Sequence, residues 1–366
     1  MTRTIKTTTT AIIQFERSTE FKKILSERIE NYFSSKKISK SADARMYSKT
    51  IIMLGWLAAS YFLLVFAAHG PLTGLIFAVS LGLAAAGVGF NIPHDGGHRA
   101  YGKHPFVNRL AATAFDLLGA SSYVWHWKHN VLHHGYTNLA GIDDDLDIGG
   151  IGRLAPEQRR LWMHRFQQFY LWALYGFLPA KWTFVDDFKA LVSGRIGPHR
   201  FPRPKGKELG LLFGGKILFF FLAFALPLFF HSFWMVLLFY AISSAVLGVT
   251  LSVVFQLAHC VQEADFPAAR SKEVQNEWAA HQVETTVNFC RDSKIIGWYL
   301  GGLNMQIEHH LFPKVCHVHY PALSRIVEGV CKDFGVRYTC HRNAFAAIAS
   351  HYRWLREMGR FNDVAA

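Results

Sequence analysis

Three short clusters of histidine dominate the chemistry that this sequence could carry. They are His94-Asp-Gly-Gly-His98, His129-Asn-Val-Leu-His133-His134 and Gln306-Ile-Glu-His309-His310. Neutral imidazole is the commonest protein ligand for borderline metals such as iron and zinc. The clusters hold seven of the nineteen histidines, which is more than one zinc site with four ligands needs. The pattern therefore predicts two metal ions close together, and two irons facing a buried hydrocarbon would imply oxygen chemistry.

The spacing within the first two clusters matches the repeat of a helix. His94 and His98 are four residues apart, so both imidazoles lie on one face of a helix. His129 and His133 repeat this spacing, and His134 follows roughly 100° further around an α-helix. We therefore expect a single helix to contribute ligands to two metals at once.

Other candidate residues carry a weaker signal. Gln306 takes the first position of the third cluster, where a further histidine would complete the pattern, and it could ligate a metal weakly or hold a hydrogen bond. His259 ends an apolar run, where an ionisable residue is usually functional, and we expect it to be a ligand. His126 is expected to pack or to support a ligand rather than to bind metal. For His281 and Gln282 a surface or packing role is favoured over support of a ligand.

Two long stretches without charge decide the fold class. Residues 51–92 and 217–258 contain no Lys, Arg, Asp or Glu. A helix needs about 20 apolar residues to cross a bilayer, so each stretch of 42 residues fits two spans with a tight turn. The sequence therefore predicts an all-α integral membrane protein, with four transmembrane helices in two hairpins and a helical cytosolic cap that carries the histidines.

The basic residues predict the orientation of the chain. Both hairpin turns, near residues 69–71 and 231–233, lack Lys and Arg. Because cytoplasmic segments carry the excess of Lys and Arg, both termini and every histidine cluster are expected on the cytoplasmic face. The net charge of +13 is interpreted as a surface beside anionic membrane lipids. Nucleic acid is not expected as a partner, because the charges form no stripe or known module.

The chain is thus expected to consist of five consecutive segments. The first contains an amphipathic helix with Phe21, Leu25, Ile29 and Phe33 on one face, expected to pack on the cytosolic part. Residues 161–178 are rich in aromatic side chains and are expected to lie on the membrane surface. The segments are 1–45 (cytosolic), 46–92 (first hairpin), 93–209 (cytosolic and interfacial, with two clusters), 210–260 (second hairpin) and 261–366 (cytosolic, with the third cluster).

The three motifs together resemble those of the membrane fatty acid desaturases. Glutamine in place of the first histidine of the third cluster is similar to the front-end desaturases, which act between an existing double bond and the carboxyl end. The resemblance extends over roughly residues 50–340. It implies an enzyme that uses O2 and two iron ions to introduce a cis double bond, at the Δ5 or Δ6 position, into a fatty acyl chain carried by CoA or a phospholipid. The iron ligands it implies are His94, His98, His129, His133, His134, His309 and His310, with His259 as an additional histidine.

The sequence departs from many front-end members in one respect. They carry a fused cytochrome b5 domain with a His-Pro-Gly-Gly motif, and this sequence has no such motif. We therefore expect the electrons to come from a separate protein, either a ferredoxin or a free cytochrome b5 with its reductase. Cys316 stands where the family often has proline, which leaves the implied ligands unchanged.

Two other functions are compatible with the same residues. A lipid hydroxylase or another lipid oxidase would use the same di-iron scaffold, and the sequence does not distinguish it from a desaturase. A zinc-binding membrane hydrolase or receptor would hold one metal per chain and would not depend on O2. Iron and zinc analysis of the purified protein would separate this last alternative from the other two.

Overall fold

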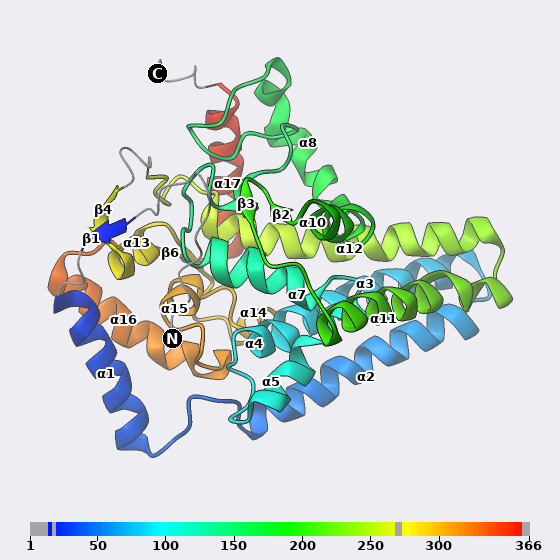
Figure 1. The fold of residues 1–366 in the computed structure, drawn as a ribbon, viewed down its shortest axis with the longest axis horizontal. Helices are drawn as coiled ribbons and strands as arrows, with labels where there is room; N and C mark the ends of the chain where they lie inside the picture. The colour runs from blue at the N-terminus through cyan, green and yellow to red at the C-terminus, as the bar shows by residue number, and fades with distance from the viewer. Residues whose placement is uncertain (1–13, 17–19, 268–272, 361–366) are drawn as a thin grey trace.

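Four long helices run side by side and form the stem of the molecule (Figure 1). The computed structural model describes residues 14–16, 20–267 and 273–360. Among these residues, four helical segments are long and apolar enough to cross a membrane. They are α2 (Ala44–Phe66), α3 with α4 (Pro71–Asn91 and Pro93–Gly97), α11 with η6 and η7 (Lys207–Phe220, Phe221–Ala225 and Pro227–Phe229), and α12 (Phe233–His259).

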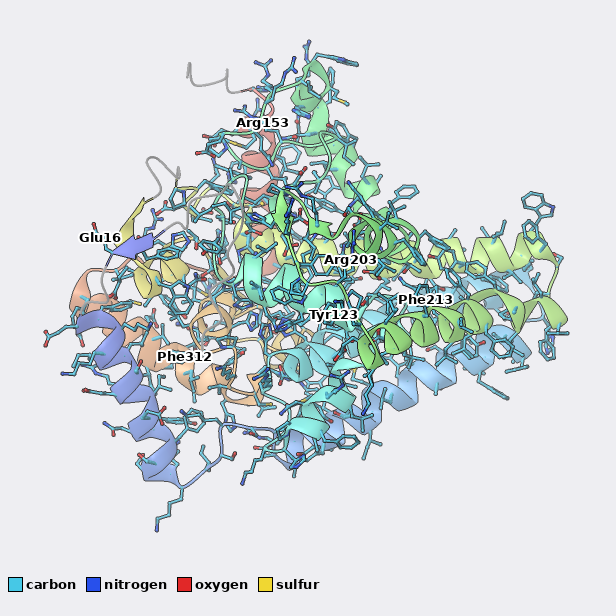
Figure 2. The ribbon with its side chains drawn as sticks, in the orientation of Figure 1. Glu16, Tyr123, Arg153, Arg203, Phe213 and Phe312 are labelled. Carbon is cyan, nitrogen blue, oxygen red and sulfur yellow. The ribbon has the colours of Figure 1, made fainter. Side chains whose placement is uncertain are left out.

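The outer faces of these helices suit a hydrocarbon environment. Large apolar side chains such as Ile51, Phe62 and Trp234 are exposed on them, and so is Phe213 on α11, which is labelled in Figure 2. Helices that are apolar all round are either membrane spans or buried in a large core. The prediction of four helices that are long and apolar enough to span a membrane is therefore confirmed.

Small residues let α3 approach its neighbours closely. A Cβ atom at Gly82 would lie 2.6 Å from the carbonyl oxygen of Ser243 on α12, and one at Gly87 would lie 2.9 Å from the sulfur of Met53 on α2. Small residues at such contacts are how helices pack in membranes, where no hydrophobic effect drives them together. The helix α3 thereby lies between α2 and α12 and carries the first histidine cluster at its end.

The rest of the chain forms a helical region at one end of the stem, here called the head (Figure 1). Three two-stranded sheets are its only strands among the described residues: β1 (Gln14–Glu16) with β4 (Glu273–Glu277), β2 (Arg195–Ile196) with β3 (His199–Arg200), and β5 (Asn288–Phe289) with β6 (Cys340–His341). Its α-helices are α1 (Glu20–Lys36), α5 (Pro105–Ala112), α6 (Ala114–Leu117), α7 (Ser122–Trp125), α8 (Gln167–Leu174), α9 (Leu178–Lys181), α10 (Asp187–Ser193), α13 (Trp278–Glu284), α14 (Lys294–Tyr299), α15 (Gln306–Leu311), α16 (Tyr320–Phe334) and α17 (Ala344–Met358).

The amphipathic helix near the N-terminus packs on the head, as the sequence predicts. In α1, Phe21 and Leu25 join Val327 and Val330 of α16 in one core cluster, and Ile29 lies in a second cluster with residues of α16. The apolar stripe of α1 is thus buried against protein. This confirms the prediction that α1 packs on the rest of the chain.

The aromatic segment 161–178 is divided rather than continuous. It consists of the 3-10 helix η3 (Trp162–Phe166), α8 and the 3-10 helix η4 (Tyr175–Phe177), and it leads through α9 into the π-helix η5 (Trp182–Asp186). Trp162, Phe169 and Phe177 are 64% to 78% exposed. The predicted single helix is therefore divided into several short helices, on which some of the aromatic side chains are exposed.

The histidine clusters begin where the stem meets the head. Pro93 starts α4 directly after α3, so the first cluster continues the second long helix. The second cluster lies in the π-helix η1 (His126–His133) and the residue that follows it. The backbone amide of His134 donates to the carbonyl of His129 at 3.0 Å. The expectation of α-helical geometry is wrong here, because the turns of η1 are one residue wider. The third cluster forms α15, and His259 is the last residue of α12.

Candidate metal centre

Eight histidines from four separate parts of the chain meet in one buried site. Each is at most 6% exposed. Their rings lie against one another, with ring centroids 4.5 Å apart for His94 and His309 and 4.3 Å apart for His134 and His310. The site contains all the histidines that the sequence analysis selected as ligands, namely His94, His98, His129, His133, His134, His259, His309 and His310.

The histidines divide into two sets that could each hold a metal ion. Within each set, one ligand atom of every residue lies within 4.8 Å of the corresponding atoms of the others. One set is His94, His98, His129 and His309, and the other is His133, His259 and His310. His134 lies between the two, because it groups with His309 and His310 and its Nε2 is 3.3 Å from Nε2 of His129.

The wide turn of the π-helix explains how one segment serves both sets. His134 follows His129 by five positions, and the wide turn at the end of η1 brings the two imidazoles onto the same side. His133 lies beside them and faces His259, with ring centroids 4.7 Å apart. Single π-turns within helices occur frequently at functional sites. The segment thus presents three imidazoles to the centre of the site.

Nitrogen atoms without partners face this centre. In the described part of the chain, Nε2 of His94, His98, His309 and His310 and Nδ1 of His134 are buried without a hydrogen-bond partner. Buried polar atoms in native proteins are nearly always satisfied, so several unpaired nitrogens in one place call for an explanation. Bound metal ions would satisfy them. The donor set, which consists of imidazoles, fits iron or zinc.

Hydrogen bonds from outside the cluster orient the other ring nitrogen of three ligands. Nδ1 of His133 lies 3.0 Å from a carboxylate oxygen of Asp143, and Nδ1 of His310 lies 2.9 Å from the side-chain oxygen of Gln282. Nδ1 of His309 is 3.3 Å from the hydroxyl of Tyr320. Such bonds fix the tautomer and leave Nε2 free for a metal, which is the usual arrangement in protein metal sites.

A second layer of polar contacts holds these supporting residues in place. Thr137 donates its hydroxyl to the side-chain oxygen of Gln282 at 2.9 Å, and the Gln282 amide donates to the carbonyl of His134 at 3.3 Å. Nε2 of His281 lies 2.9 Å from the carbonyl of Thr137. Asn138 donates its side-chain amide to the carbonyls of His259 and Thr285. The segments that carry the ligands are therefore tied to one another as well as to the site.

Burial sets the protonation state of the ligands outside the long helices. Burial, followed by the charges of neighbouring imidazoles, holds the pKa of His98, His134, His309 and His310 well below the ordinary value. Burial also lowers the pKa of His133, but the nearby carboxylates of Asp143 and Asp145 together outweigh it, so the pKa is raised. Neutral imidazole is the form that ligates a metal. These four imidazoles are therefore already in the ligating form at neutral pH.

The weaker candidates have different surroundings. Gln306 is 1% exposed, and its side-chain oxygen has no hydrogen-bond partner among the described residues. His126 lies outside the metal groups, and its Nδ1 contacts the amide of Asn130 at 2.9 Å. Asn130 in turn donates to the carbonyl of Gly97, next to His98. His126 therefore supports the site indirectly, in line with the expectation that it packs or supports a ligand.

Several residues of the site had no recognisable signal in the sequence. Gln282 was expected to have a surface or packing role, and this expectation is wrong, because it is fully buried and bonded to His310. Lys49 was not singled out at all. Its ammonium donates to Asn91 at 2.9 Å and lies 2.9 Å from Nε2 of His317, whose Nδ1 contacts Asp95 at 2.9 Å. This arrangement ties α2 to the first cluster and to the head.

Three adjoining cavities run past the histidines. A cavity of about 190 Å³ lies in the head and is lined by His129, His133 and His259. A narrow one of about 40 Å³ begins at His94, and it shares Trp125, Trp182 and Phe255 with the first. The third, of about 460 Å³, lies between the four long helices and shares a wall with the narrow one; the shared residues are Ala85, Leu118, Pro179, Thr183 and Leu247. The narrow cavity, here called the neck, therefore shares walls with both of the other cavities and lies where it could connect them.

The large cavity is apolar and extends far into the stem. Along α2 its lining runs from Leu54 to Val65, a distance of roughly 16 Å at 1.5 Å per residue. This is comparable with half the thickness of a bilayer core, about 15 Å, which one acyl chain of a lipid fills. The cavity therefore has the length and the lining to hold most of an acyl tail.

The comparisons with known proteins agree on one family. The family model described as fatty acid desaturase matches residues 70–342. The sn-1 linoleoyl-lipid 6-desaturase of Synechocystis sp. is 37% identical over 351 residues, which cover 95% of this chain and 98% of that protein. The protein of the same name from Arthrospira platensis is 36% identical over 361 residues, 96% of both chains. The acyl-lipid (8-3)-desaturase of Physcomitrium patens is 40% identical over 344 residues, 93% of this chain and 72% of that protein.

Proposed function

The chain belongs to the fatty acid desaturase family, and on this premise we propose that it introduces a cis double bond into an unsaturated fatty acyl chain, on the carboxyl side of the existing double bond. The position would be Δ6 or Δ5. The relatives named above support this choice, because their names give 6-desaturation of linoleoyl lipid and (8-3)-desaturation of acyl lipid. The same names favour an acyl chain carried by a lipid over one carried by CoA.

We propose that the eight histidines hold two iron ions. One ion would be held by His94, His98, His129 and His309, and the other by His133, His259 and His310. His134 lies where it could serve either, and the free oxygen of Gln306 could hold a ligand water. The unpaired nitrogens described above are the observation that supports this proposal. Bound iron would supply the redox chemistry that activates O2, which non-redox zinc could not.

The connected cavities would position the acyl chain. Trp125, Trp182 and Phe255 form the wall common to the head cavity and the neck, directly beside His94 and His129. A chain that runs from one cavity to the other would pass the metal centre at this wall. Holding two particular carbons there excludes other positions, and small misplacements can cost about 100-fold in rate.

The unequal size of the two ends supports reaction near the carboxyl end. The head cavity contains charged residues such as Lys128 and Asp147, whereas the cavity in the stem is lined almost entirely by apolar side chains. The methyl tail would therefore occupy the large cavity in the stem, and the carboxyl end would remain in the smaller one. This leaves few carbons between the metals and the head group, as a double bond at Δ5 or Δ6 requires. The relative size of the two cavities is the single observation that carries the proposed position.

The topology and the electron source are part of the proposal. We propose that α2–α3 and α11–α12 form two membrane hairpins, with both termini and the metal centre on the cytoplasmic face. The absence of Lys and Arg from the connections 67–70 and 230–232 supports this orientation. Electrons would come from a separate protein, a ferredoxin or a cytochrome b5 with its reductase.

Lipid analysis of a host that expresses the chain tests the proposal. With linoleate supplied, the lipids should acquire a new double bond on the carboxyl side of the existing ones, and the His309→Ala variant should abolish it. A hydroxylated product, or a double bond on the methyl side, would contradict the proposed reaction or its position. If purified protein with a reductase and donor gives no product and binds zinc instead of iron, the desaturase proposal fails.

A further inference from the structure

The neck between the two larger cavities depends on one glycine. Gly89 lines it on α3, opposite Leu118 from the segment after α6 and Leu251 from α12. It is five residues before His94, or roughly 7 Å along the helix. Ala85 lies one turn further into the stem and lines both the neck and the large cavity. The side of α3 that faces the cavities therefore carries very small residues next to the metal centre.

Neither the backbone nor helix packing requires a glycine at this position. Gly89 lies inside α3 and is not among the residues with positive φ. A Cβ atom there would lie 3.9 Å from Leu118 and 4.0 Å from Leu251, which are ordinary contact distances. At Gly82 and Gly87 of the same helix, by contrast, the nearest atoms would be 2.6 Å and 2.9 Å away. Those two glycines are explained by close packing, and Gly89 is not.

A glycine inside a helix is less favourable than alanine, because it loses more conformational freedom on folding. At Gly89 no close packing of helices offsets this loss of stability. Its consequence is empty space, because the nearest atoms that a Cβ would meet are the side chains of Leu118 and Leu251, which also line the neck. The neck holds only about 40 Å³, so even a few added carbon atoms would fill a large part of it.

We propose that Gly89 is a specificity-determining residue that keeps the neck open, so that the long methyl-side part of an acyl chain can pass from the metal centre into the large cavity. This inference rests on the proposed desaturase function. Acyl chains that end before the neck can bind whatever residue stands at position 89. Acyl chains that extend beyond the neck can bind only if this residue is small. A larger side chain at position 89 therefore discriminates by the length of the methyl tail.

The test compares Gly89→Leu with Gly55→Leu in purified, iron-loaded enzyme. Gly55 is an exposed glycine inside α2 with no atom within 4 Å of its Cβ position, and it does not line any of the three cavities. For linoleoyl lipid, kcat/KM of Gly89→Leu should fall on the order of 100-fold, while Gly55→Leu should match the wild type. Iron content should be unchanged in both variants. Gly89→Ala adds one methyl group in ordinary contact and should give an intermediate loss.

A binding measurement on metal-free protein separates obstruction from damage to the site. Linoleoyl lysolipid should raise the melting temperature of the wild type and of Gly55→Leu, but not that of Gly89→Leu. A decanoyl lysolipid, whose shorter tail needs little space beyond the metal centre, should stabilise all three. Adding Leu118→Ala to Gly89→Leu should restore part of the linoleoyl binding by widening the neck.

The outcomes are distinct. If Gly89→Ala and Gly89→Leu bind and convert linoleoyl lipid as the wild type does, the inference is wrong. It is also wrong if Gly89→Leu loses decanoyl and linoleoyl binding equally while Gly89→Ala behaves as the wild type. Absence of desaturation by the wild type would instead refute the proposed function. The binding measurement would still test whether Gly89 keeps the neck open.

Discussion

Nδ1 of His310 donates a hydrogen bond to the side-chain oxygen of Gln282 at 2.9 Å, across 28 positions of the chain. Thr137 donates to the same oxygen, and the Gln282 amide donates to the carbonyl of His134. One glutamine therefore orients a ligand from the third cluster and contacts the backbone of the second. Its position depends on α13 lying against α15, where the two helices share the core residues Val283 and Ile307.

Replacing Gln282 by leucine should weaken metal binding without removing a ligand. Loss of the partner that orients a metal-bound histidine typically costs about 10-fold to 100-fold in affinity. Gln282→Glu keeps an acceptor for His310 and should retain more iron than Gln282→Leu. Iron content after dialysis against graded chelator measures the effect. Equal iron retention in Gln282→Leu and the wild type would show that the hydrogen bond does not support the site.

His259 should be needed for one of the two metal ions. It groups with His133 and His310, and both of these also contact other residues of the site. We expect His259→Ala to bind about half as much iron as the wild type, because only one of two sets is incomplete. His69→Ala serves as the control and should bind the full amount, because His69 is exposed between α2 and α3 and lies outside the metal groups. Elemental analysis of the purified variants decides the question, and full iron occupancy in His259→Ala would exclude His259 as a ligand.

Lys49 should stabilise the junction of stem and head. It is 4% exposed, and its ammonium contacts Asn91, the carbonyl of Trp298 and Nε2 of His317 at 2.8 Å to 2.9 Å. Lys49→Met would leave these buried acceptors without a donor, and this should reduce the free energy of unfolding by about 3 kcal/mol. The exposed Lys23→Met control should change it by less than about 0.5 kcal/mol. Thermal unfolding in detergent measures both, and equal melting temperatures would contradict the structural role.

Acid should destabilise the metal-free protein partly through His351. This residue is fully buried, its Nδ1 donates to the carbonyl of Cys260 at 2.6 Å, and its Nε2 accepts from the hydroxyl of Tyr175 at 2.8 Å. Burial lowers the pKa of His351 from 6.5 to about 4. Below pH 6.5 the unfolded chain therefore binds a proton that the folded chain does not, so stability falls with decreasing pH until the folded pKa is passed.

The size of this effect follows from the shift in pKa. A difference from 6.5 to about 4 corresponds to roughly 3 kcal/mol of stability lost between these pH values. His351→Gln should remove that part of the pH dependence, although it lowers stability at neutral pH. Denaturant unfolding of iron-free protein between pH 7 and pH 4 provides the measurement. An unchanged slope in His351→Gln would show that another group is responsible.

The sequence alone determined the features that depend on local pattern. A long run of apolar residues without charge is stable only where it is shielded from water. The four long apolar helices could therefore be recognised from the composition of the sequence. Histidines four residues apart share the face of an α-helix, and this spacing correctly paired His94 with His98. The apolar stripe of α1 predicted its burial for the same reason.

Only the tertiary structure decided which residues meet. The π-helical turn that brings His134 beside His129 has no local signature. The contacts of Gln282 with Thr137, 145 positions away, and of Lys49 with His317, 268 positions away, depend on packing between distant segments. The shape of a cavity likewise depends on the positions of all the side chains around it, which come from distant parts of the sequence. The space beside Gly89 therefore could not be read from a sequence in which Gly82 and Gly87 look the same.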